Sequence, residues 1–136
     1  MTTRFLLLSF LLLFARPICA DEVYHFESAV VELTGKLVTK VFYGPPGYGE
    51  DPKVDSKETV AILQLTKPIR VVADKKDQFN ETRNGIKEVQ LINVKRIKLS
   101  PYLQKNVKLT GKLTSAVTGH HRTDVLIEID SIEMAK

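Results

Sequence analysis

The chain has 136 residues, with 20 Lys and Arg, 16 Asp and Glu, a formal net charge of +4 and a single Cys. This length fits one domain rather than several, and one Cys excludes a framework of intrachain disulfides. The sequence shows no basic stripe of the kind that marks a dedicated nucleic-acid binder.

The N-terminus predicts a cleaved export signal over residues 1–20. One basic residue precedes an apolar run of about a dozen residues, and a small residue, Ala20, stands at the expected cleavage point. Arg16-Pro17 ends the run well before the roughly 20 residues that a membrane-spanning helix needs. An uncleaved anchor is therefore disfavoured. Lipoprotein processing at Cys19 is the other alternative, and it is disfavoured because Ile18 stands where a small residue is wanted.

Cleavage after Ala20 would leave residues 21–136 as a single domain in the periplasm or outside the cell, with no membrane span. Two of the 20 basic residues, Arg4 and Arg16, lie in the signal, which leaves 18 against 16 acidic residues and a net charge of +2. The only Cys is lost as well, so the domain depends on a hydrophobic core. A domain of this size buries roughly 65% of its unfolded surface, which suffices for one.

Apolar residues at every second position predict that this domain is mainly β. The first strand is expected from Val31 to about Phe42, with its inward face formed by Val31, Leu33, Gly35, Leu37, Thr39 and Val41. The following segment, to about Lys57, is rich in Gly, Pro and acidic residues and is predicted to be a loop.

The next strand is expected over 59–65, where the residues are almost continuously apolar, as in a central strand. Pro68 predicts a break, and the run resumes over 69–72. A polar loop is predicted over 73–85, and a third strand over 89–94.

The C-terminal third completes the predicted elements. Ser100 followed by Pro101 is typical of the first turn of a short helix, because Pro at the first helical position loses no hydrogen bond. A fourth strand is expected over 106–116, a loop over 117–124 and a fifth strand over 125–129.

The sequence V-E-L-T-G-K-L at 31–37 is echoed by V-K-L-T-G-K-L at 107–113. The chain is too short for two complete units, so the echo indicates two similar strands of one barrel. A glycine inside a strand marks a sharp bend or a bulge, and a small barrel needs such bends to close. Five strands and one short helix before the fourth predict a closed OB-like barrel, in which the loops joining strands one to two and four to five flank a shared binding face.

The sequence resembles a family of small secreted bacterial proteins known only as a domain of unknown function. The shared motifs are a T-G-x-L strand, a G-P-P-x-Y loop, an E-T-x-x-I-L strand and a V-x-L-T-G-x-L strand that leads into T-G-H-H-x-T, found here at 34–37, 44–50, 58–69 and 107–127. The resemblance implies the fold and the compartment, but no activity. This chain departs from the family at Arg70, Arg122 and Asp124, where relatives often have Cys, His and Pro.

The candidate ligand-binding residues lie in the two unusual loops and comprise Tyr43, Tyr48, His120, His121 and Arg122. If the barrel is correct, these loops are neighbours. Aromatic rings beside a guanidinium and imidazoles can stack on a sugar or a base, or anchor a protein partner. The plainer interpretation is that Tyr43 packs over the end of the barrel and the prolines stiffen the loop.

Other groups of polar residues carry weaker functional interpretations. The adjacent His120 and His121, with Asp124 or the distant His25, form a candidate metal site, but neighbouring residues of an extended chain point to opposite faces. Acidic residues in the first loop could serve acid–base chemistry but are simpler to explain as turn formers: Glu50, Asp51 and Asp55. Lysines on the outer strand faces are interpreted as solvated, aggregation-blocking side chains: Lys36, Lys40, Lys108 and Lys112.

The sequence therefore predicts a secreted or periplasmic binding module that is not an enzyme and needs no cofactor. No motif for a nucleophile elbow, a phosphate loop or a zinc protease helix is present. The expected ligand is a small polar molecule, and export with near-neutral charge argues against nucleic acid. The alternatives are a protein-interaction module (an envelope stress accessory or an inhibitor of a secreted enzyme), a divalent-metal-binding protein and a small hydrolase.

Overall fold

The computed structural model describes residues 21–27 and 29–136; the predicted signal, 1–20, lies outside the described residues. The elements in chain order are β1 (Glu22–His25), β2 (Val31–Tyr43), β3 (Lys57–Val72), β4 (Arg83–Ile92), the 3₁₀ helix η1 (Ser100–Tyr102), β5 (Asn106–Ser115) and β6 (Val125–Met134). The described part of the chain has no helix long and apolar enough to cross a membrane.

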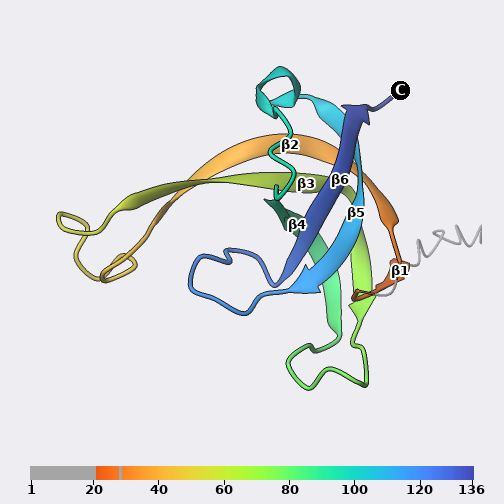
Figure 1. The fold of residues 1–136 in the computed structure, drawn as a ribbon, viewed down its shortest axis with the longest axis horizontal. Helices are drawn as coiled ribbons and strands as arrows, with labels where there is room; N and C mark the ends of the chain where they lie inside the picture. The colour runs from red at the N-terminus through yellow and green to blue at the C-terminus, as the bar shows by residue number, and fades with distance from the viewer. Residues whose placement is uncertain (1–20, 28) are drawn as a thin grey trace, which may run out of the picture.

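Five of the strands close into a barrel (Figure 1). β2 pairs antiparallel with β3, and β3 with β4. β4 then pairs parallel with β6, and the ring closes through the antiparallel pairs β6–β5 and β5–β2. This order, with a short helix before β5, is the predicted OB-like barrel, so the predicted fold class is confirmed.

The first strand, β1, lies outside the ring and was not predicted from the sequence. It pairs parallel with the end of β3, from Glu22 opposite Ile69 to His25 opposite Val72. The chain then turns across the barrel, where Phe26 donates its N–H to the Val72 carbonyl and Glu27 donates to that of Leu113. Phe26 is only 2% exposed and belongs to the central hydrophobic cluster. The N-terminal segment therefore closes one end of the barrel with an aromatic side chain.

The predicted break at Pro68 is wrong, because β3 runs without interruption over Lys57–Val72. The proline is tolerated because the ladder to β4 is irregular at this point, with a register shift between Gln64 and Ile69. Two other strands are longer than predicted. The strand expected from residue 89 is β4, which begins at Arg83, and the strand expected to end at residue 129 is β6, which extends to Met134.

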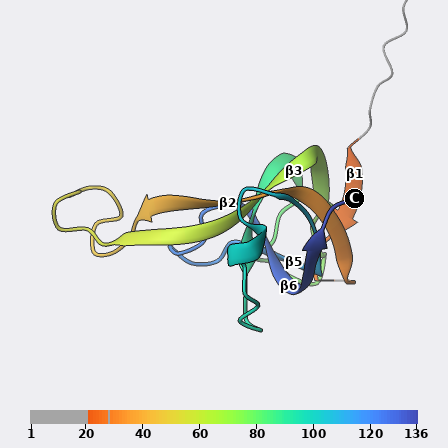
Figure 2. The same ribbon diagram turned by 90° about the horizontal axis from the view of Figure 1, so that it is seen from above.

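The predicted inward face of the first strand is correct only as far as Leu37. Val38 is 8% exposed, whereas Thr39 is exposed and Val41 is 62% exposed. Beyond Leu37, β2 and β3 continue as a two-stranded arm that projects from the barrel (Figures 1 and 2), so no core lies beneath that face. On the opposite face Val38 is paired with Ile62, which is fully buried.

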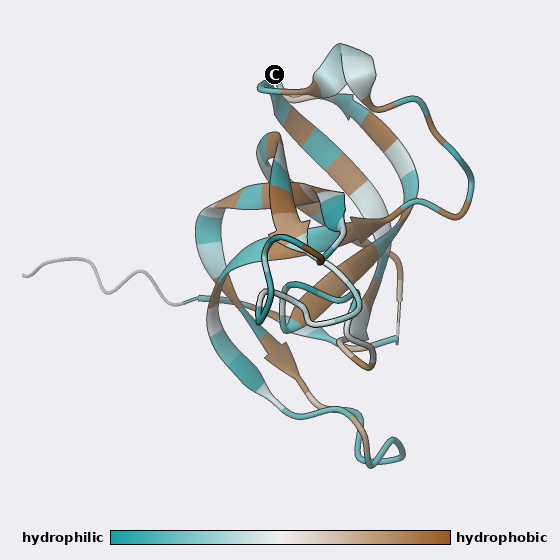
Figure 3. Ribbon diagram, turned by 90° about the vertical axis from the view of Figure 1, so that its left-hand side faces the viewer, coloured by the Kyte–Doolittle hydropathy of each residue, from teal (hydrophilic) through white to brown (hydrophobic). Residues whose placement is uncertain are grey.

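The barrel interior is filled by apolar side chains that alternate along each strand, visible as bands of contrasting hydropathy in Figure 3. The two echoed glycines lie where strands cross closely. A Cβ on Gly35 would stand 2.1 Å from the Gln64 carbonyl oxygen, and one on Gly111 would stand 2.2 Å from that of Glu128. The pairing of β5 with β6 shifts in register between Thr110 and Gly111, which confirms the predicted bulge at Gly111. At Gly35 the pairings of β2 show no register shift, so no bulge is present there.

Candidate functional site

Two loops that are far apart in the sequence meet on one side of the barrel. The first loop, residues 44–56, joins β2 to β3, and the second loop, residues 116–124, joins β5 to β6. Glu58, at the start of β3 beside the first loop, anchors the second loop: one carboxylate oxygen lies 2.8 Å from Nδ1 of His120, and the other accepts a hydrogen bond of 2.7 Å from Nη2 of Arg122. Tyr48 of the first loop contacts the same two residues of the second loop.

Arg122 is the centre of this contact. Its Nη2 also donates to the Tyr43 carbonyl at 2.8 Å, and its guanidinium carbon lies 5.4 Å from the ring centre of Phe42 and 5.5 Å from that of Tyr48. Both distances are within the range of a cation–π contact. Because the side chain is only 12% exposed, Arg122 acts mainly to hold the two loops together.

His120 is oriented by Glu58 and remains open to solvent. A carboxylate can only accept, so Nδ1 must carry the proton in this contact, and Nε2 of the neutral ring is left as an acceptor. The His120 side chain is 59% exposed. The ring of Tyr48 meets it edge-on, with the ring centres 6.2 Å apart. The result is a fixed imidazole that presents an acceptor beside an aromatic side chain.

The Glu58 carboxylate is stabilised in its charged form. Its hydrogen bond from Arg122 lowers the pKa of Glu58 most strongly, burial opposes that shift, and the contact with His120 lowers the pKa further. The contact between the loops therefore carries a persistent negative charge against the guanidinium near neutral pH.

His121 faces a different partner from His120. Its Nδ1 accepts the backbone N–H of Val117 at 2.9 Å, so in the neutral ring the proton resides on Nε2. Neither nitrogen of neutral His121 then offers a free lone pair for a metal. Among the residues that the structure describes, no group of three or more His, Cys, Asp or Glu side chains is placed to hold a metal ion.

The second loop is fastened to the barrel wall by Gln90 of β4, a residue that is only 6% exposed. The Gln90 side chain accepts from the Arg122 N–H at 2.6 Å and donates to the His120 carbonyl at 3.2 Å. Its backbone N–H is bonded to the Thr123 hydroxyl. The second loop therefore lies against the outer face of β4, and hydrogen bonds hold it there at His120, Arg122 and Thr123.

The first loop is organised around Asp55, which is 8% exposed. Its carboxylate accepts backbone N–H groups from Gly47 at 2.6 Å, Gly49 at 2.7 Å and Asp51 at 3.2 Å. Of the three loop acids singled out in the sequence, Asp55 is thus a turn former, with its oxygens committed to the backbone. Glu50 and Asp51 lie at the surface.

We expect Asp55→Asn to destabilise the first loop at neutral pH and to flatten the acid dependence of unfolding. Burial raises the pKa of Asp55, but the three N–H bonds outweigh it and the net shift is downward. A carboxyl with a lowered pKa in the folded state stabilises the protein above its unfolded-state pKa, and that stability is lost as the pH falls through the folded-state pKa.

The measurement is the unfolding midpoint of the wild type and of Asp55→Asn between about pH 7 and pH 3. The variant should start lower and fall less steeply. Asp51→Asn is the matched control, since the one hydrogen bond of its carboxylate among the described residues is local, from the Lys53 N–H at 3.2 Å. Parallel curves for Asp55→Asn and the wild type would contradict the assignment.

The remaining candidate residues divide into exposed and paired ones. Tyr43 and Tyr48 are 39% and 46% exposed. Lys40 is bonded to both oxygens of Glu88 at 2.7 Å, and Lys108 lies between Glu32 and Glu133. The lysines of the outer strand faces are therefore balanced by acidic neighbours at two of their four positions.

Sequence reasoning predicted that these two loops are neighbours but missed Glu58 and Gln90. Gln90 lies within a predicted strand and Glu58 directly before one, where a polar residue is ordinarily assigned to a solvated face. The only signal for Glu58 was its position beside the first loop, within the E-T-x-x-I-L motif. The contact of Glu58 with His120 spans 62 positions, and that of Gln90 with Arg122 spans 32.

Comparison with known proteins gives one match. The family model described as "Domain of unknown function (DUF4431)" matches residues 88–133, which extend from within β4 almost to the end of β6. No curated protein matches the chain, and no solved structure does. The matched region contains Gln90 and the whole second loop, whereas the first loop and Glu58 lie outside it. This part of the chain is thus similar to a domain for which no activity is described.

Proposed function

We propose that the chain is a secreted or periplasmic, non-enzymatic binding module whose ligand face comprises Tyr43, Tyr48, His120, His121 and Arg122. The observation that carries this proposal is the contact of Glu58 with both His120 and Arg122. Glu58 lies just after the first loop, so its carboxylate holds the second loop beside the first before any ligand arrives. Such pre-organisation reduces the entropy that is lost on binding.

The expected ligand carries hydroxyl groups, as a glycan fragment does. Nε2 of His120 is an exposed acceptor in the neutral ring, and the partly exposed ring of Tyr48 meets the imidazole edge-on. A hydroxyl donating to the imidazole while carbon–hydrogen surface packs on the aromatic ring would use both. Arg122 would act by positioning Tyr48, since its guanidinium already lies against that ring.

Nucleic acid fits this face less well. The mature domain would carry a net charge of only +2, and nucleic-acid affinity depends largely on the phosphates that basic residues neutralise. The face itself contains the charged Glu58 beside its one guanidinium.

A protein partner is the second candidate function, favoured by apolar residues exposed on the same segments. Val41 of the arm, Val54 of the first loop and Val117 of the second loop are 62%, 65% and 68% exposed. Together with the two tyrosines they would supply the aromatic and aliphatic contacts typical of the centre of a protein interface.

The test of the proposal is thermal unfolding of the protein against a panel of glycan fragments, oligonucleotides and divalent metals. A ligand at a hundred times its dissociation constant should stabilise the fold by about 2.7 kcal/mol, on the order of 10 °C in midpoint. We expect a shift with a glycan fragment, lost in His120→Ala and in Tyr48→Ala. His25→Ala is the matched control, because His25 is an exposed histidine on β1.

Each other outcome identifies a different function. A shift with zinc or copper that disappears in the His120 and His121 double variant would replace the proposal by metal binding. A shift with an oligonucleotide would replace it by nucleic-acid binding. A flat response to the whole panel would contradict a small ligand and favour a protein partner, which cross-linking through Val54→Cys would then capture.

A further inference from the structure

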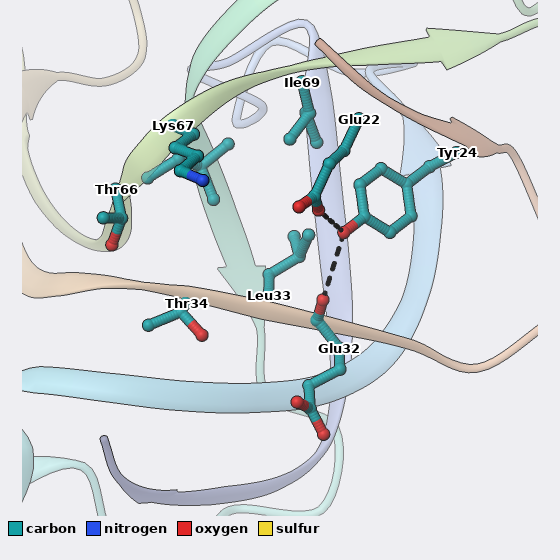
Figure 4. Close-up of a pocket in the computed structure, with 9 residues that line it drawn as sticks. Glu22, Tyr24, Glu32, Leu33, Thr34, Thr66, Lys67 and Ile69 are labelled. Atoms are coloured by element: carbon teal, nitrogen blue, oxygen red, sulfur yellow. Dashed lines mark hydrogen bonds between the residues drawn. The ribbon is translucent and has the colours of Figure 1, made fainter. Parts of the chain in front are cut away.

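A cavity of about 300 Å³ lies between β1, β2 and β3, away from the two loops (Figures 1 and 4). It opens where the sheet separates. β2 pairs with β3 only from Gly35 opposite Leu65 onward, and β1 joins β3 only from Ile69 onward. The irregular stretch of β3 between these points leaves the gap. Leu33 and Ile69, each 3% exposed, line it together with polar residues.

One side of this cavity is rich in hydrogen-bond acceptors. The Tyr24 hydroxyl donates to the Glu22 carboxylate at 2.6 Å and lies 3.4 Å from the Glu32 carbonyl oxygen (Figure 4). A phenol has one hydrogen, and the shorter contact takes it. Burial, and then Glu22, raise the pKa of Tyr24 to about 12, so the hydroxyl keeps its proton. The Glu32 carbonyl, the second Glu22 oxygen and the phenol lone pairs are left as acceptors.

The opposite side of the cavity carries a cation. Lys67 comes from the irregular stretch of β3, and Figure 4 shows its side chain across the cavity from Tyr24. The salt bridges formed by the described residues do not include Lys67. Glu22 and Lys67 thus supply opposite charges to one cavity without forming an ion pair with each other, and Leu33 and Ile69 line the same cavity.

We propose that this cavity is a second binding site, which takes a small zwitterion with an apolar side chain, such as an apolar amino acid. The three hydrogens of the ammonium would satisfy Glu22, the Tyr24 oxygen and the Glu32 carbonyl. The carboxylate would pair with Lys67, and the apolar side chain would lie on Leu33 and Ile69. A cavity of about 300 Å³ accommodates a molecule of this size.

The test compares L-leucine with two analogues, 3-methylbutylamine, which lacks the carboxylate, and 4-methylpentanoate, which lacks the ammonium. Amide signals of the protein are followed by NMR during titration to about 10 mM. We expect leucine to shift the signals of Leu33, Thr34 and Ile69, and each analogue to bind at least about 10-fold more weakly, because each loses one charge-assisted contact. No shift with leucine, or equal binding of either analogue, would overturn the proposal.

Matched variants assign the two charges. Glu22→Gln and Lys67→Gln should each weaken leucine binding by about 10-fold or more. Glu50→Gln and Lys112→Gln, which change exposed residues elsewhere, should not. His120→Ala should also leave leucine binding intact, because His120 belongs to the other site. Unchanged binding in Glu22→Gln with the thermal midpoint preserved would overturn the assignment of the ammonium position.

Discussion

Alanine in place of Gly111 is expected to lower the free energy of unfolding by about 3 kcal/mol or more, roughly 10 °C in midpoint for a domain of this size. The added Cβ would stand 2.2 Å from the carbonyl oxygen of Glu128 and 3.0 Å from Cγ1 of Ile127. The nearer atom belongs to the backbone of β6, so no rotamer change relieves the clash. β5 and β6 would have to separate at the bulge, where the barrel bends.

Gly35→Ala should behave in the same way, because its Cβ would stand 2.1 Å from the Gln64 carbonyl oxygen on β3. The echoed sequence supplies controls: Lys36→Ala and Lys112→Ala change the next residue of each strand, and both side chains are exposed. These controls should cost less than about 0.5 kcal/mol. Chemical denaturation measures all four variants. Glycine variants as stable as their lysine controls would show that the strands do not approach this closely.

The barrel could be predicted because its signals are local. Alternation along β2 and β5 revealed the strands, and the glycine within β5 marked its bulge. What escaped prediction depends on contacts between distant segments. β1 has only four residues, Glu22–His25, too few for a periodic pattern, and it is defined by backbone pairing with β3. The change of face after Leu37 arises because the arm extends beyond the barrel, which the alternation itself does not record.

The meeting of the two loops could be predicted because it follows from the barrel. Unusual composition identified both loops, and the fold places them together. Arg122 was predicted to be one of the ligand-binding residues, and its side chain is only 12% exposed. Its environment is set by Phe42 and Glu58, which lie far away in sequence and on different strands. An arginine in a polar loop gives no sign of such partners until the topology is known.

Phe26→Ala is expected to cost about 3–5 kcal/mol, the usual range for deleting a buried aromatic side chain. Phe26 is 2% exposed and closes the barrel end between Val72 and Leu113, to whose carbonyls the adjoining backbone is bonded. Its removal would leave a cavity in the central cluster and loosen the segment that holds β1 against β3. Thermal and denaturant unfolding measure the loss, and Val23→Ala, at a position 56% exposed on β1, is the matched control.

Phe26 also relates the stability of the barrel to the position of the predicted cleavage after Ala20. Cleavage after Ala20 would retain Phe26 and all of β1, whereas a chain that began at Ala29 would lose both. The shorter chain should therefore be destabilised at least as much as Phe26→Ala, while a chain that begins at Asp21 should be fully stable. Equal stability of the two chains would show that the aromatic side chain does not close the barrel. A large difference would make the barrel's core dependent on the residues that immediately follow the predicted export signal.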